Sequence, residues 1–363
     1  MKYGASAAST RQRLLQFEPY LRKHGIEIET SQLLADEHIT RLAKGRRSNP
    51  VAIAASYLKR LGVLLRSRSY DLIWVHYETF PYLPSAFERL VALSGQPIVY
   101  DCDDAIFHTY DVHPNAVVRW FLRNKLAPLL RSASICLCGN AYLEAYASQY
   151  CDETIVVPTV VDTSAYRPRP KDTSRAPVVG WIGSPSTWKY VEPLLPTILP
   201  LIAARGGRFR AIGTGPGGRG YPGIEVVDWS EETEIAEVQA FDVGIMPLPD
   251  ERWARGKCGY KLIQYMACGL PVVGSPVGVN TEIIDHGLNG FLASDLGEWE
   301  QSLNKLLTDP ALRETMGSLG RARAVERYSL ASQEPRVLSA LTRAASRSRA
   351  QSGAAARNPG QVS

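Results

Sequence analysis

The sequence has no long apolar run. Its 363 residues contain no uninterrupted hydrophobic stretch near the roughly 18 residues that a membrane-spanning helix requires. The first residues also lack the basic, apolar and small-residue order of a signal peptide. We therefore expect no transmembrane helix and a cytoplasmic location.

Cysteine is sparse, and its spacing argues against two further classes of protein. The six cysteines include neither a pair separated by two residues nor one with a nearby histidine partner. We expect reduced, buried side chains, and neither a disulfide framework nor a zinc site. They are Cys102, Cys136, Cys138, Cys151, Cys258 and Cys268.

Positive charge is concentrated at the C-terminus. The formal net charge is +5, and residues 331–363 contain five arginines against one glutamate, a surplus of four. From Ala344 on, Ala, Ser, Arg and Gly dominate, so we predict a disordered basic tail over 344–363. No recognition motif or aromatic-interleaved basic patch accompanies the tail, and we expect no nucleic-acid binding.

Apolar runs alternate with amphipathic stretches, which predicts an α/β fold with parallel sheets. The length exceeds the roughly 250–300 residues at which one core stops growing, and a Pro-rich charged connector covers residues 166–177. We predict domains over 1–165 and 166–330, a helix over 331–343, and then the tail. Strands are predicted near Ile26–Glu29, Leu72–Val75, Ile98–Tyr100, Ser134–Cys138, Thr154–Val157, Val178–Ile182, Arg208–Ile212, Glu225–Val227, Val243–Met246, Pro271–Val273 and Gly290–Leu292. Helices are predicted near Thr10–His24, Val51–Ser67, Leu83–Leu93, Pro114–Leu130, Ala141–Tyr150, Val191–Ala204, Glu231–Gln239, Tyr260–Cys268, Leu296–Leu307 and Pro310–Arg327.

The most informative stretch is RGKCGYKLIQYMACGLPVV at residues 255–273, a glycine-rich basic loop that leads into a short helix. Gly256 and Gly259 permit close backbone approach, and Lys257 and Lys261 supply positive charge. The free amides at the start of the helix also favour an anion, so the combination suits a diphosphate. An ordinary αβ unit with solvated lysines is the alternative, because helix N-termini bind anions only sometimes.

Four other runs in the C-terminal half are also informative: VVGWIGSPSTWKY at 178–190, RFRAIGTGPG at 208–217, FDVGIMPLPD at 241–250 and SPVGVNTEIIDHGLNGFLA at 275–293. Together with the basic loop they resemble the nucleotide-sugar-binding domain of the retaining glycosyltransferases of family four. Looser matches in the N-terminal half are YDCDDAIF at 100–107 and residues 139–166. The resemblance implies the GT-B fold, two doubly wound Rossmann-like domains that face a cleft, with ligands at the carboxyl ends of the strands. It also implies a nucleoside diphosphate sugar as donor substrate, no separate cofactor and no metal.

In such a transfer the leaving diphosphate gathers negative charge, which cations and amide dipoles must stabilise. By resemblance, Lys189 occupies the diphosphate-binding position, and the arginine found five residues earlier in the family is Ser184 here. We expect Lys257 or Lys261 to replace that charge. A surface lysine at a helix start is the alternative interpretation of Lys189.

The family's two glutamates, separated by seven residues, correspond to Gly256 and Gln264. The second contacts ribose hydroxyls in the family, and Gln264 keeps an acceptor oxygen for that role. The first approaches the sugar or its phosphate, and Gly256 cannot substitute for it. Either Lys257 and neighbouring amides hold the donor instead, or donor turnover is impaired. Those amides belong to Cys258, Gly259, Tyr260 and Lys261.

Other positions complete the predicted donor site. Trp229 lies where such enzymes bind the base, and its indole can stack on it; a partly buried structural tryptophan is the alternative. Glu282 resembles the acidic end of the family's glycine-rich segment, in which Gly278 would let the backbone approach the donor. Glycines at strand ends leave room for the nucleotide, namely Gly183, Gly213 and Gly215.

The N-terminal domain is expected to receive the acceptor. Asp101, Asp103 and Asp104 follow a predicted strand and therefore lie at its carboxyl end, and relatives place a sugar-contacting histidine near the position of Asp103. We expect these acids to accept hydrogen bonds from sugar hydroxyls, with helix capping as the alternative and too few oxygens for calcium. His76 and Glu78 are secondary candidates for acceptor contacts. The predicted catalytic residues are Asp103, Lys189 and Lys257.

The start of the chain resembles the loop and first helix that follow a first β-strand in relatives, yet only Met1 to Tyr3 precede it. We expect a start upstream, or a misassigned Met1. With that strand present, Ser9 and Arg11 would lie on an acceptor-side loop.

Residues 114–131, PNAVVRWFLRNKLAPLLR, are predicted to form a basic amphipathic helix. Such a helix suits an anionic membrane surface, where lipid-linked acceptors lie. A plain surface helix packed on its own sheet is the alternative. The expected apolar side is Val118, Phe121, Leu122, Leu126 and Leu129, and the expected basic side is Arg119, Arg123 and Lys125.

The sequence therefore predicts a cytoplasmic glycosyltransferase, able to lie at the inner face of a membrane. It would move a sugar from a nucleoside diphosphate to a glycan or lipid-linked acceptor with retention, in surface-polysaccharide or glycoconjugate assembly. Two alternatives stay open. One is a sugar-nucleotide epimerase of the same fold, and the other is a non-catalytic nucleotide-binding scaffold, which Gly256, Ser184 and the short N-terminus favour.

Overall fold

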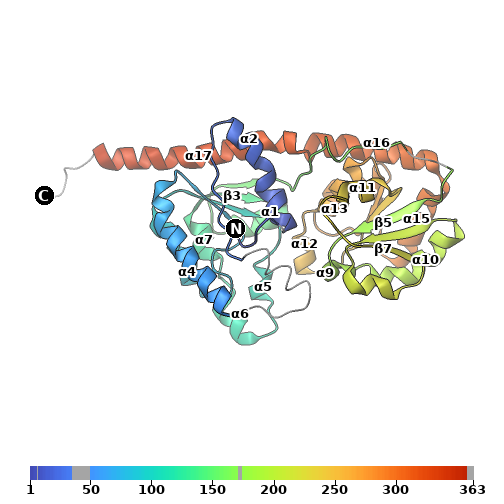
Figure 1. Ribbon diagram of the computed structural model, residues 1–363, viewed down its shortest axis with the longest axis horizontal. Helices are drawn as coiled ribbons and strands as arrows, with labels where there is room; N and C mark the ends of the chain where they lie inside the picture. The colour runs from blue at the N-terminus through green and yellow to red at the C-terminus, as the bar shows by residue number, and fades with distance from the viewer. Residues whose placement is uncertain (6, 35–49, 171–173, 358–363) are drawn as a thin grey trace. The chain divides into compact units, whose positions relative to one another are not determined.

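The computed structural model describes residues 1–5, 7–34, 50–170 and 174–357. The chain divides into two compact units (Figure 1). The first contains Met1–Thr159 and the chain from Gln333 on, and the second contains Val160–Ser332. The second unit thus begins at Val160, where the sequence suggested residue 166.

The first unit is built on a four-stranded parallel sheet. The strands, in spatial order, are β1 (Ile73–His76), β2 (Ile98–Cys102), β3 (Ala133–Cys138) and β4 (Thr154–Val156). They correspond to the apolar runs predicted between residues 72 and 157. Because the strands are parallel, their carboxyl ends lie at one edge, where His76 and Asp101 are register partners.

The strand predicted over residues 26–29 is not part of this sheet. A ladder exists only where backbone groups pair, and the pairing in this segment lies further along the chain. Leu33 N donates to Met1 O at 3.1 Å and Leu34 N to Lys2 O at 3.0 Å. A strand at 26–29 was therefore the wrong prediction, since the contact with the first residues falls on 31–34.

Proline divides two of the predicted helices in the first unit. Residues 10–24 are covered by α1 (Ala8–Arg13), a 3-10 turn (Leu15–Phe17) and α2 (Glu18–Lys23), and residues 114–131 by α6 (Ala116–Leu122) and α7 (Ala127–Ser132). Pro19 and Pro128 lie in the first turns of α2 and α7, where the missing N–H costs nothing, so each starts a new helix. This unit also contains α4 (Pro50–Arg66), α5 (His108–Asp111), α8 (Ala141–Ala147) and the 3-10 turns Ser67–Ser69, Ser85–Leu90 and Ala92–Ser94.

The second unit has a six-stranded parallel sheet in the order β10-β9-β8-β5-β6-β7. Counted from the start of the unit, this is the doubly wound order 3-2-1-4-5-6 read from β7. The chain reverses its direction of travel across the sheet between the neighbours β5 and β8, and ligands of such sheets bind beyond the carboxyl ends at that point. The strands are β5 (Val178–Ile182), β6 (Arg208–Ile212), β7 (Ile224–Val227), β8 (Val243–Met246), β9 (Val272–Gly274) and β10 (Gly290–Leu292).

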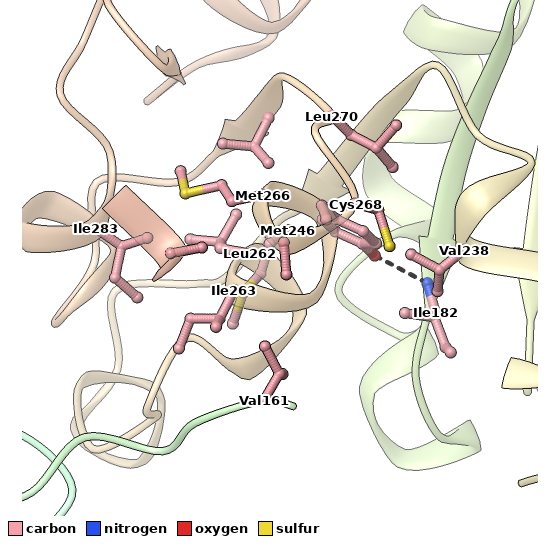
Figure 2. Packing of buried hydrophobic residues seen from close by; sticks show 14 of the residues in the cluster. Val161, Ile182, Val238, Met246, Leu262, Ile263, Met266, Cys268, Leu270 and Ile283 are labelled. Carbon is pink, nitrogen blue, oxygen red and sulfur yellow. Dashed lines mark hydrogen bonds between the residues drawn. The ribbon is translucent and has the colours of Figure 1, made fainter. Parts of the chain in front are cut away.

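Helices cover both faces of this sheet, and each face has its own core. On one face Trp181 packs in a cluster with α10 (Leu195–Ala204) and α15 (Leu296–Thr308). On the other, Ile182 and Met246 lie among residues of α13 (Tyr260–Ala267), and Ile182 N donates to the Tyr265 hydroxyl at 3.0 Å (Figure 2). The unit also contains α9 (Pro185–Trp188), α11 (Glu234–Gln239), α12 (Arg252–Arg255), α14 (Asn280–Ile283), α16 (Pro310–Arg327) and the 3-10 turns Glu192–Leu194 and Gly215–Gly220.

The last helix, α17 (Leu330–Arg357), differs from the sequence prediction. We expected a helix only to residue 343 and disorder beyond it, but the helix continues to Arg357. Alanine and arginine are strong helix formers, and Arg343 and Arg347 both pair with Glu153 of the first unit, so low apolar content alone did not prevent folding. Residues 358–363 of the predicted tail lie outside the described residues. Of the helices that the structure describes, none has the length and apolarity that crossing a bilayer demands.

Candidate functional site

Two glycine loops meet at the carboxyl ends of β5 and β6. Gly213 follows β6 with φ of 76°, a left-handed conformation that favours glycine. A Cβ at Gly213 would lie 2.3 Å from the carbonyl oxygen of Gly183, which follows β5, and 3.2 Å from Cβ of Trp229. The contact is between backbones, so a side chain at residue 213 would separate the two loops.

Lys261 brings a cation to this meeting point. It lies in the first turn of α13, and a Cβ at Gly183 would be 2.9 Å from its Cε. Its Nζ is 5.8 Å from the centre of the Trp181 ring. Three features therefore come together at the carboxyl end of β5, beside the switch point. They are the Gly183 loop, the cation of Lys261 and the free backbone amides at the start of the eight-residue helix α13.

Trp229 and Gln264 are joined by a carboxylate that was not predicted as a site residue. Glu234, at the start of α11, accepts hydrogen bonds from the Trp229 indole, from the Tyr166 hydroxyl and from Gln264 Nε2, the last at 2.7 Å. Gln264 Nε2 also donates to Tyr166 at 2.9 Å, and the glutamine is buried. Trp229 is 38 % exposed, so one end of this network reaches solvent. The acid-rich run after Trp229 was the available signal, but by itself it predicts only the start of a helix.

The basic loop packs against the segment 275–283. Gly259, the N-cap of α13, has φ of 67°, and a Cβ there would meet Ile283 at 2.2 Å. Gly278 has φ of 54°, and its Cβ would lie 2.6 Å from the carbonyl oxygen of Arg255. Both glycines are therefore required for loop conformation and loop packing, and the approach to a ligand predicted for them stays a prediction. Lys257 is half-buried, with Nζ 5.6 Å from the centre of the Trp253 ring.

The remaining donor-side candidates lie around this core of the site. Ser184 is the exposed N-cap of α9 and forms a capping box with Thr187, so its hydroxyl already has a local role. Lys189 ends the same short helix and is exposed, with Nζ 5.1 Å from the centre of the Tyr190 ring. Gly215 has a left-handed backbone conformation and lies against Pro185 of α9. Gly256 and Cys258 are buried, Tyr260 is half-buried and Glu282 is exposed.

In the first unit the acids after β2 have different surroundings. Asp101 is buried and accepts from Arg13 Nε at 2.8 Å, while Arg13 also donates to the carbonyl of Val157. Burial raises the pKa of Asp101, against the opposing charge of Arg13. Asp104 Oδ1 accepts from the backbone N–H of the next residue, Ala105, at 3.2 Å, a local contact in the turn after β2. These two acids hold the local structure.

Asp103 differs from them because it joins a histidine and a tyrosine at the strand end. It accepts from His76 Nε2 at 3.2 Å and is also hydrogen-bonded to Tyr77, whose hydroxyl contacts Ser9. Burial acts to raise the pKa of Asp103, but the hydrogen bond and charge of His76, with Arg13 and Tyr77, outweigh it and lower the pKa to about 2. Tyr77 has φ of 69°, which is rare for a residue with a bulky side chain. Asp103 is therefore an ionised acceptor beside a strained residue, a combination typical of functional sites.

Two other acceptor-side candidates have structural contacts. Glu78 is buried and accepts from Lys2 Nζ at 2.9 Å and from the Tyr110 hydroxyl at 2.5 Å. Arg11 is in α1, and it donates to the carbonyl of Ala5 at 2.8 Å. These contacts hold the start of the chain and α5 in place. The cluster that forms around Tyr77 instead consists of three other predicted residues, His76, Asp103 and Ser9.

A cavity of about 890 Å³ lies in the first unit, away from these residues. Its lining comes from Met1, Leu14 and Leu15, α2, residues 24–31, residues 69–74 and α17, so one of its walls is the outer edge of β1. None of the predicted site residues lines it. We place the candidate site at the strand ends because charge, glycine loops and backbone amides converge there. Within the described residues, no group of three His, Cys, Asp or Glu side chains is arranged to hold a metal ion.

The chain has two parallel-sheet α/β units, one of them doubly wound, and this is the fold class of the GT-B glycosyltransferases. The chain is similar to a glycosyltransferase from Rickettsia africae with a TM-score of 0.67 at 12% identity, over 94% of this chain and 96% of that chain. It is also similar to Anabaena Alr3699/HepE in complex with UDP-glucose, with a TM-score of 0.61 at 19% identity, over 90% and 89% of the two chains.

The match to a family model lies in the second unit. Residues 176–309 match the family model described as glycosyl transferases group 1. A stretch of 66 residues, 18% of this chain, is 39% identical to the human alpha-1,3/1,6-mannosyltransferase ALG2 and covers 15% of that relative's length. The part of the chain that matches the family model contains the two glycine loops, Trp229, the basic loop and Lys261.

Proposed function

We propose that the protein transfers a glycosyl group from a nucleoside diphosphate sugar to a glycan or lipid-linked acceptor. The observation that carries the proposal is the convergence of Gly183, Gly213 and Lys261 at the switch point of the second sheet. Fixed amides and a cation at this place suit the diphosphate of a donor. The family match over residues 176–309 and the UDP-glucose complex of the Anabaena neighbour support the same donor class.

The proposed roles follow from the chemistry of each side chain. Lys261, helped by Lys257 and Lys189, would stabilise the negative charge that develops on the leaving diphosphate. Trp229 would stack on the base at its exposed face, and Gln264 would orient the ribose. Asp103, held ionised by its neighbours, would accept hydrogen bonds from sugar hydroxyls.

Retention at the anomeric carbon and a setting in surface-polysaccharide or glycoconjugate assembly are further parts of this proposal. Both come from the resemblance to the retaining family. In a retaining transfer on one face of the donor, the leaving phosphate takes the acceptor proton, so no dedicated base is required. A cytoplasmic setting fits the six cysteines, all of which are free and buried, because thiols persist in a reducing compartment.

The donor part is tested by thermal unfolding of the full chain with UDP, GDP, dTDP or ADP. A ligand that binds only the folded state raises the unfolding temperature. We expect a rise with one nucleotide, reduced in Lys261→Ala and kept in Lys305→Ala. Lys305 is the matched control, an exposed lysine of α15 that contacts Phe291. No rise with any nucleotide, in a folded sample, would refute the donor site and favour a scaffold.

The transfer part is tested by incubating the protein and an acceptor extract with sugar derivatives of the nucleotide that stabilises it. A glycosylated acceptor whose new linkage has the donor's anomeric configuration is the expected product. An epimerised nucleotide sugar without transfer would identify an epimerase. Tight nucleotide binding without either product would identify a non-catalytic relative.

A further inference from the structure

Helix α6 presents large apolar side chains to solvent. Val117, Trp120 and Phe121 are 63%, 70% and 61% exposed. Their spacing of three and four residues places them on one face of the helix. The rings of Trp120 and Phe121 contact edge to face, with centroids 4.5 Å apart. Most soluble proteins expose few contiguous apolar side chains, and a cluster of this kind marks an interaction site.

The exposed face belongs to a well-anchored helix. Leu122 is buried on the opposite side, and α6 packs against α5. Asn115 caps the helix, accepting from the backbone N–H of Val117 at 2.8 Å. Arg119 donates to the carbonyls of His113 and Pro114, at 2.6 and 3.0 Å, which ties the helix to the preceding loop. In Figure 1, α6 lies at the end of the first unit opposite α17.

This geometry corrects the amphipathic helix predicted from the sequence. The stretch 114–131 forms two helices, and the expected apolar side is divided, because Phe121 faces solvent while Leu122 is buried. Lys125, expected on the basic side, is buried and bonded to Glu88 at 2.9 Å. The exposed surface of α6 is thus a short aromatic projection with an arginine on either side in sequence.

The charges near the exposed apolar side chains of α6 indicate what kind of partner would bind there. Between Asp111 and Glu144 the chain contains no acidic residue. Arg119 and Arg123 flank the two aromatic residues in sequence, and Arg123 is exposed. Lys125 is neutralised by its buried partner and adds nothing to the surface. An apolar cluster bordered by cations is complementary to a surface with an apolar interior and anionic headgroups, which describes an anionic membrane.

We propose that Val117, Trp120 and Phe121 insert into the headgroup boundary of an anionic membrane while Arg119 and Arg123 contact lipid phosphates. Tryptophan suits this boundary because its ring is apolar and its N–H is polar. A seven-residue helix inserts little area, so the attachment is reversible. The inference rests on the proposed transfer for its purpose, which is to hold the enzyme where a lipid-linked acceptor lies.

The test is sedimentation of the full chain with vesicles of phosphatidylcholine alone or with added phosphatidylglycerol. Two arginines near an anionic surface predict binding roughly 10- to 30-fold stronger with phosphatidylglycerol. The double variant Trp120→Ser/Phe121→Ser is expected to lose about 10-fold or more. Leu288→Ser, which removes a 60 % exposed leucine of the second unit, is the matched control and should bind as the parent does.

A second measurement locates the contact on Trp120 itself. The chain has seven tryptophans, so quenching by brominated lipid is compared between the parent and Trp120→Phe. This variant keeps an aromatic ring and should still bind vesicles, but it should lose most of the quenching. Full quenching in Trp120→Phe would place the membrane contact elsewhere and overturn the proposal.

Other outcomes also decide the matter. Absence of binding to phosphatidylglycerol vesicles, or unchanged binding of the double variant, would overturn the proposal. A dimer that the double variant abolishes, without vesicle binding, would assign the patch to a second copy of the chain. Nucleotide-induced stabilisation is measured on the same samples, so vesicle binding without a nucleotide effect refutes the proposed function alone.

Discussion

Replacing Gly213 by alanine tests whether the two glycine loops must touch. Gly213 has φ of 76°, a left-handed conformation that costs a residue with a Cβ about 1–2 kcal/mol, and alanine at this position would incur that cost. The added Cβ would also lie 2.3 Å from the carbonyl oxygen of Gly183. That oxygen belongs to the backbone, so no side-chain rotation relieves the overlap, and the displaced loop adds about 1–3 kcal/mol. We expect Gly213→Ala to lower the free energy of unfolding by about 2–5 kcal/mol.

Gly223→Ala supplies the matched control for this substitution. Gly223 has φ of 83°, but a Cβ there would meet nothing within 4 Å, so only the conformational cost of about 1–2 kcal/mol applies. Urea unfolding of both variants measures the difference, and titration with the nucleotide that stabilises the parent measures the site. Gly213→Ala should also bind that nucleotide more weakly, because the displaced Gly183 loop moves away from Lys261. Equal losses of stability in the two variants, with nucleotide binding intact in both, would refute the reasoning.

Three further predictions concern charged groups. Lys261→Ala should weaken nucleotide binding by about 10-fold in isothermal titration, the effect of losing one charge-assisted hydrogen bond, and an unchanged affinity would remove Lys261 from the site. Glu88→Gln should cost about 3–5 kcal/mol in urea unfolding because it leaves Lys125 buried without a counter-charge, whereas replacing both by apolar residues should recover most of the loss. The folded pKa of Asp103, about 2, lies below its ordinary 3.8, so its stabilisation is present above pH 3.8 and disappears as the pH falls through 2. Asp103→Asn should therefore lose about 2 kcal/mol less stability than the parent between pH 5 and pH 2, and parallel curves for the two proteins would contradict the assigned pKa.

The strands of the second sheet were predictable because of their burial. A parallel strand covered on both faces has a continuous apolar sequence, and β5 and β8 match their predicted bounds, Val178–Ile182 and Val243–Met246. Periodicity was less informative for helices that contain proline. It predicted one helix over 10–24 and another over 114–131, and a proline in the first turn of α2 and of α7 marks a new start in each. At 26–29 the apolar alternation predicted a strand, but pairing depends on a neighbour that the local sequence does not contain.

The position of the donor site was predictable, but its internal contacts were not. Loops after parallel strands gather at one edge, so the motifs after β5 and β6 had to lie close together. The direction of each side chain depends on tertiary packing. The sequence predicted that Gly259 and Gly278 let the backbone approach a ligand, but it did not show that they also make room for Ile283 and the Arg255 carbonyl. Aspartates adjacent in sequence likewise divide into a buried partner of Arg13 and an ionised partner of His76.

The network around Glu234 gives a physical reason for the glutamine at residue 264. The family resemblance implies a glutamate there, but Gln264 Nε2 lies 2.7 Å from a carboxylate oxygen of Glu234 and donates to it. A second carboxylate at that distance could not remain ionised beside the first, because like charges raise one pKa strongly. Glutamine at 264 and glutamate at 234 are therefore a compatible pair, in which the negative charge is supplied from α11 and the donor from α13. Restoring glutamate at 264 alone would set two acids against each other and weaken the hold of Glu234 on Trp229 and Tyr166, so the family's residue would suit this site only if residue 234 changed with it.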